Sequence, residues 1–78
     1  MKDFLIYLLT QITDHPDEIS VTESSIGPQV VFSVHTHPQD MGKVIGKEGK
    51  IIHAIRNLVK VLAVKEDKLV RVELVETP

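Results

Sequence analysis

The sequence predicts an α+β fold in which a three-stranded sheet packs against three helices. Two long segments place apolar residues three or four positions apart, which is typical of amphipathic helices. Three others alternate apolar and polar residues, as half-buried strands do, and helix-start signals between them predict a short additional helix. The order along the 78-residue chain is helix, strand, strand, helix, helix, strand. This length allows one hydrophobic core, so we expect a single domain over residues 1–78.

The first helix is predicted over residues 3–13, where apolar positions recur at a spacing of four along one face. Phe4 lies on this predicted core face. Asp14 and Pro16 follow and end the helix. Residues 18–24 alternate and predict a short edge strand.

The central strand is predicted over residues 29–35, after a turn at Gly27 and Pro28. Its alternate apolar residues, including Phe32, share one face, and we expect Phe32 to be buried.

A two-turn helix is predicted over residues 38–45, because Pro38 suits a first helical position and Asp40 favours the helix dipole. Gly42 lies inside this helix, where glycine costs up to about 1 kcal/mol relative to alanine. We therefore expect a close backbone contact to require Gly42.

The third helix is predicted from Lys50 to about Ala63, with the apolar positions 51, 55, 58 and 62 facing the core. The polar residues between them are expected on a solvent-exposed face of the helix: Lys50, His53, Arg56, Asn57 and Lys60. A second apolar set, Ile52, Val59 and Ala63, forms either a partner surface or a wider core stripe. A charged turn over 65–68 leads to the last strand, 69–75.

Composition excludes several classes of protein. With 42% hydrophobic and 26% charged residues, the chain is typical of soluble globular proteins rather than disordered ones. No apolar run approaches the roughly 20 residues of a membrane span, and no cleavage site for a signal peptide follows residues 4–9. The absence of cysteine excludes disulfides and thiolate chemistry, and we expect a cytoplasmic protein.

The charge is unevenly distributed. The net charge is −2, yet residues 40–60 hold five basic residues against two acidic ones. This concentration of positive charge favours a polyanionic partner, although lysines spread over a solvated helix face are the alternative.

The tetrapeptide Gly46-Lys47-Glu48-Gly49 lies between two predicted helices. Its glycines allow a tight turn and a close approach of a phosphodiester, and the amides that begin the next helix favour an anion. The mononucleotide pattern G-x-x-x-x-G-K-[ST] fails, because it would need glycine at Val44 and a hydroxyl residue at Ile51. The dinucleotide pattern also fails at Val44, so the loop suits a polynucleotide better than an enclosed nucleotide.

The segment "VIGKEGKII" resembles the V-I-G-x-x-G-x-x-I core of KH domains, in which the GxxG loop clamps the backbone of about four nucleotides. The element order resembles the type II arrangement, and "DMGKVIGKEGKIIHAIRNLV" is similar to the small bacterial KhpA-type KH proteins over essentially the whole chain.

The resemblance implies a protein that binds single-stranded RNA, such as an RNA chaperone or post-transcriptional regulator. It implies a homodimer, a larger RNA-binding partner of the Jag/KhpB type, and a link to cell elongation and division. The groove beside the loop is expected to be built from Val44, Ile45 and Ile52 together with one face of the strand at 30–34. The RNA-binding residues carried over are Lys43, Val44, Ile45, Gly46, Lys47, Glu48, Gly49, Lys50 and Ile52.

Glu48 partly cancels Lys47, so we expect weak, backbone-dominated RNA binding that falls as salt rises. The competing hypothesis is a KH-fold module for protein interaction or dimerisation that acts through a partner RNA-binding protein. A zinc site at His35 and His37 is not expected, because zinc needs three or four ligands. No residue set resembles a nucleophile with its base, so we predict neither an enzyme nor a cofactor.

Overall fold

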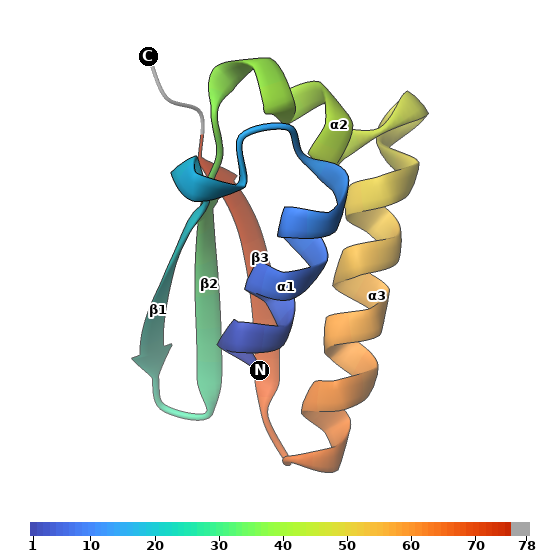
Figure 1. Cartoon of the computed structure of the whole chain (residues 1–78). Helices are drawn as coiled ribbons and strands as arrows, with labels where there is room; N and C mark the ends of the chain where they lie inside the picture. Colours follow the sequence, from blue (N-terminus) through green and yellow to red (C-terminus); the bar gives the residue numbers. More distant parts are fainter. Residues whose placement is uncertain (76–78) are drawn as a thin grey trace.

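Figure 1 shows the computed structural model of the chain, which describes residues 1–75. The predicted order of helices and strands is confirmed. The elements are α1 (Lys2–Ile12), η1 (Pro16–Glu18), β1 (Ser20–Ile26), β2 (Gln29–His35), η2 (Pro38–Asp40), α2 (Met41–Ile45), η3 (Lys47–Gly49), α3 (Lys50–Lys65) and β3 (Leu69–Val75), where η marks a 3-10 turn. The helix predicted over 38–45 is thus divided into the turn η2 and the short helix α2.

The sheet is mixed, with strand order β1-β2-β3. Strand β1 pairs antiparallel with β2 through a turn at Gly27, which has a φ of 59°. Strand β3 pairs parallel with β2 on the other side, after the chain has crossed over through α2 and α3. The prediction that β2 is central and β1 an edge strand is confirmed. Helices α1 and α3 cover the same face of the sheet, and α2 lies at one end of them (Figure 1).

The core lies between that face and the helices. Val30, Phe32 and Val34 of β2 are buried, as the alternation predicts. The remaining members of the core are Leu5, Leu9, Val21, Val44, Ile52, Ile55, Val59 and Val72. Within residues 1–75, no helix has the length and apolar character needed to cross a membrane.

The face that α3 turns to the core differs from the prediction. Its buried residues are Ile52, Ile55, Val59 and Ala63, so the second apolar set belongs to the core. Of the stripe predicted to be core, Ile51 and Leu58 are 38% and 41% exposed. The two sets are one residue apart, which is a rotation of about 100° around the helix axis. The packing of α3 against α1 and the sheet selects the second of them.

Phe4 was predicted to be buried, but it is 37% exposed. Together with Met1, Leu58 and Leu62 it lines a depression of about 430 Å³ between α1 and α3, with Lys65 and Glu66 at its border. An apolar depression therefore lies where the sequence predicted core.

Candidate nucleic-acid interface

The loop between α2 and α3 has an unusual backbone. Gly46 has φ 76° and ψ 177°, and Glu48 and Gly49 have φ values of 57° and 75°. The N–H of Gly46 donates to the carbonyl oxygen of Gly42 at 2.8 Å, and the N–H of Gly49 donates to that of Gly46 at 3.2 Å. Three residues with positive φ thus lie in the four positions between the end of α2 and the start of α3.

The glycines of this region have different surroundings. A Cβ on Gly46 would stand 2.5 Å from Cγ1 of Ile51, so this position admits no side chain. A Cβ on Gly49 or Gly42 would meet nothing within 4 Å. The expectation that a close contact requires Gly42 is wrong for contacts within the described protein. At Gly49 the positive φ requires glycine, while the space beside it stays open.

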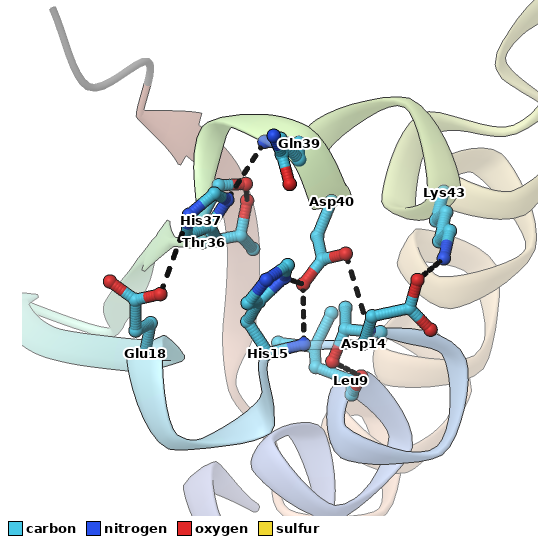
Figure 2. Close-up of polar contacts among 10 residues, drawn as sticks. Leu9, Asp14, His15, Glu18, Thr36, His37, Gln39, Asp40 and Lys43 are labelled. Atoms are coloured by element: carbon cyan, nitrogen blue, oxygen red, sulfur yellow. Dashed lines mark hydrogen bonds and ion pairs between the residues drawn. The ribbon is translucent and has the colours of Figure 1, made fainter.

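The charged side chains near the loop are exposed, and they differ in their partners. Within residues 1–75, neither Lys47 nor Lys50 forms an ion pair. Lys43 forms one with Asp14, two residues after the end of α1 (Figure 2). Glu48 is also exposed. The positive charge available beside the loop therefore comes from Lys47 and Lys50, and Asp14 offsets the charge of Lys43.

The apolar residues carried over from the family motif lie deeper. Val44 and Ile52 are buried in the core, and Ile45 is half-buried. In this structure Val44 and Ile52 pack beneath the loop and do not form an open surface.

A groove of about 560 Å³ runs between α3 and the edge strand β3. Its lining residues are His53, Arg56, Asn57, Lys60, Val70, Arg71, Val72, Glu73 and Leu74. His53 is one turn from the start of α3, so the groove begins close to the loop. No residue of the strand at 30–34 lines this groove: the helix-facing residues of β2 are buried, and β3 forms the strand side of the groove.

Arg56 connects the two walls of this groove. Its Nε–H donates to the carbonyl oxygen of Val72 at 3.2 Å. The N–H and C=O of one residue point to the same edge of a strand, and residues two apart share that edge. The backbone groups of Val70 and Leu74 therefore face the groove as well. Arg71 is paired with Glu73 at 3.1 Å, so these two charges offset each other.

The sequence does not identify the α3 side of the groove as a site. The prediction of a solvent-exposed face of α3 is confirmed for His53, Arg56, Asn57 and Lys60. Their spacing of three or four residues was the available signal for a common surface. What the sequence did not indicate is that β3 lies opposite this surface.

Asp40 positions the helix that leads into the loop. Its carboxylate is 1% exposed and accepts the backbone N–H of His15 at 2.8 Å and that of Asp14 at 3.2 Å (Figure 2). Burial by itself would raise the pKa of Asp40, but these backbone hydrogen bonds, with a further contact to the His15 ring, lower it below its ordinary value. A charged carboxylate thus ties the segment after α1 to the start of α2.

His15 and His37 have structural partners. The N–H of Gln39 donates to Nδ1 of His37 at 3.0 Å, which confirms His37 as a residue that begins a helical segment. Its ring stacks on His15 with a centroid distance of 3.9 Å. No three metal-binding side chains come together within residues 1–75.

Comparisons with known proteins agree with this geometry. The family model described as KhpA/KhpB, KH domain, matches residues 2–74. RNA-binding protein KhpA of Clostridium acetobutylicum is 43% identical over 75 residues, which are 96% of this chain and 100% of the relative. The protein of the same name from Caldanaerobacter subterraneus subsp. tengcongensis is 45% identical with the same coverage.

A more distant relative is RNA-binding protein KhpA of Chlamydia caviae, 36% identical over 97% of both chains. The comparison with solved structures gives no match. The three-stranded mixed sheet with three helices in this order is that of a type II KH fold, and the chain belongs to the KhpA/KhpB family of KH domains.

Proposed function

We propose that this chain binds single-stranded RNA by gripping the phosphodiester backbone at Gly46–Gly49. One observation carries the proposal: Lys47 and Lys50, without ion pairs in the described part of the chain, flank Gly49, whose side is open. The first backbone N–H groups of α3 follow directly and carry partial positive charge. The name that the relatives share supports RNA as the polyanion.

Each residue of the loop region has a role in this proposal. Gly46 and Gly49 provide the backbone path, and Lys47 and Lys50 attract phosphates. Glu48 repels them and keeps the affinity low. Lys43 contributes to phosphate binding when its ion pair with Asp14 opens. The apolar residues Val44, Ile45 and Ile52 pack toward the core and hold the loop in place.

From the loop, the strand of RNA continues along the groove between α3 and β3. The half-buried side chains of Val70 and Leu74 offer apolar surface to bases, and Lys60 offers a charge to the backbone. Among the residues that line this groove the only ring is that of His53, and Phe, Tyr and Trp are absent, so the proposal does not rest on a base-stacking platform. We therefore propose weak binding with low sequence specificity, in the role of an RNA chaperone or post-transcriptional regulator.

The loop is tested by changing Lys47 and Glu48 to Asp together. We expect crosslinking to a single-stranded RNA oligomer to be lost while the circular dichroism spectrum is retained. Lys2→Asp is the matched control, because it makes the same change in net charge in the first turn of α1 and should leave crosslinking unchanged. RNA binding that persists in the loop variant would contradict the assignment of Gly46–Gly49 as the RNA-binding loop.

A second candidate function, self-association, is favoured by the apolar depression between α1 and α3. Phe4, Leu58 and Leu62 place apolar surface around it, and large apolar side chains gathered on a surface often mark a partner site. A second copy of the chain would bury this surface and hold two weak RNA sites together, which raises avidity. The two functions are compatible.

Sedimentation over a concentration series tests self-association. We expect a dimer that Leu58→Glu disrupts and that Val64→Glu leaves intact, since Val64 is exposed on α3 outside the depression. A monomer at every concentration would remove this candidate. If the chain alone stays monomeric but forms a complex with a larger RNA-binding protein of the Jag/KhpB type, and Leu58→Glu disrupts that complex, the partner occupies the depression instead.

A further inference from the structure

The loop Gly46–Gly49 holds backbone conformations that need support. The φ and ψ of Gly46 fall in a region limited essentially to glycine, and Glu48 is a non-glycine residue with positive φ. Such conformations cost on the order of 1–3 kcal/mol each and persist only where the surrounding structure imposes them.

Hydrogen bonds supply only part of this support. Those that Gly46 and Gly49 donate run within α2 and the loop, from backbone to backbone. Neither η3 nor α3 has a side-chain cap at its start. These bonds close the turns, but they do not fix the loop against the side chains of α3.

The side chain of Ile51 makes that contact. The position that a Cβ on Gly46 would occupy lies 2.5 Å from Cγ1, 2.8 Å from Cβ and 2.9 Å from Cδ1 of Ile51. Ile51 therefore fills the space beside the Cα of Gly46. It meets the loop at its first residue, where the backbone is most restricted.

Ile51 is not placed to touch RNA in the groove. It does not line the groove, and the helical repeat puts it on the opposite side of α3 from His53 and Lys60. Any effect of Ile51 on RNA must therefore pass through the loop.

We propose that Ile51 is a positioning residue, whose side chain wedges against Gly46 and holds the loop ready to receive a phosphodiester. A β-branched side chain suits this role, because it has one strongly preferred χ1 rotamer in a helix. The inference rests on the proposed RNA-binding function and adds a residue outside the family motif.

The test compares Ile51→Ala with wild type by binding to a fluorescent oligouridine at several salt concentrations. If the binding-ready loop falls to about a tenth of the population, the apparent Kd rises about tenfold. The slope of log K against log salt should stay unchanged, because no cation is lost. Amide hydrogen exchange over residues 47–50 should become faster.

Two further variants complete the design. Ile51→Val retains a branched Cβ and should restore most of the affinity and the slow exchange. Val61→Ala removes apolar surface from an exposed position on the same helix and should change neither Kd nor exchange in the loop.

Wild-type affinity and wild-type exchange in Ile51→Ala would overturn the proposal, as would a loss of affinity with a reduced salt slope. Should Ile51→Ala be too unstable at about 25 °C, the exchange of both proteins is compared at about 10 °C, nearer the usual temperature of maximum stability. If wild type binds no RNA, the proposed function fails, while faster loop exchange in Ile51→Ala alone still supports the wedge.

Discussion

One atom of Asp40 contacts two atoms of His15. One carboxylate oxygen of Asp40 accepts the backbone N–H of His15 at 2.8 Å and lies 3.1 Å from the ring Nδ1 of the same residue (Figure 2). Because Asp40 immediately precedes α2 and His15 follows α1, a buried charge links the end of one helix to the start of the next. The link thus fixes the start of α2, and the loop Gly46–Gly49 follows the other end of this five-residue helix.

The first prediction concerns Asp40→Asn, which we expect to lower the free energy of unfolding at pH 7. An amide in place of the carboxylate brings N–H groups toward the N–H donors of Asp14 and His15. The folded pKa of Asp40 lies below its ordinary value of 3.8, so its contribution is present above that pH and is lost as pH falls through the lowered pKa.

Urea denaturation at pH 7, 5 and 3 measures this effect. The difference between wild type and Asp40→Asn should narrow at the lowest pH. Asp17→Asn, at an exposed position in η1, serves as the control and should change stability little at any of these pH values. A difference that is equal at pH 7 and pH 3 contradicts the role of the charge.

The second prediction separates three glycines by the same change to alanine. Gly46→Ala should destabilise most, because a restricted backbone and the contact with Ile51 both oppose a side chain. Gly49→Ala should cost about 1–2 kcal/mol from its positive φ alone. Gly42→Ala should stabilise by up to about 1 kcal/mol, because it lies in a helix with open space around it. Urea midpoints in any other order would refute the account of the loop.

The third prediction concerns the ion pair between Asp14 and Lys43. Asp14→Asn should free Lys43 for a phosphate and make the slope of log K against log salt steeper by about 0.7, the value for one contact with a single strand. The pair is exposed, so stability should change by less than about 1 kcal/mol. Fluorescence anisotropy with oligouridine gives the slope, and Asp17→Asn is the control. An unaltered slope means that Lys43 stays away from RNA.

The fourth prediction concerns the charge of Glu48. Glu48→Gln removes a negative charge at an exposed position beside Lys47, so RNA should bind more tightly at low salt. The gain should shrink as salt rises, because screening shortens the reach of exposed charges to about 10 Å at 0.1 M. Equal affinities of the two proteins in low salt would show that Glu48 does not attenuate binding.

Much of the fold could be predicted because local patterns determine it. The alternation in β2 assigned Phe32 to the core, and Gly27 with Pro28 located the turn before it. The loop was also predictable, since glycines separated by two residues between helices leave few other structures.

The orientation of α3 could not be predicted, because two apolar sets one residue apart both have helical spacing. Ile51 and Leu58 are as apolar as Ile52 and Val59, and only contacts with distant segments distinguish them. The groove could not be predicted for the same reason, because it forms only where β3 lies beside α3 in the tertiary structure.

Asp40 illustrates a different limit. Its position near a helix start was read from the sequence as a favourable charge at the end of a dipole. Its partners are backbone groups 25 and 26 residues away, which no local pattern indicates. Buried hydrogen bonds between distant segments of this kind require the tertiary structure.

The central claim is that RNA lies along the loop and the groove between α3 and β3. Titration of oligouridine into the ¹⁵N-labelled protein, followed by amide chemical shifts, tests it most directly. We predict that the largest changes fall at Gly46–Lys50, on α3 from His53 to Lys60, and on β3 from Val70 to Leu74. Changes confined to α1, or absent from the loop, would contradict the account.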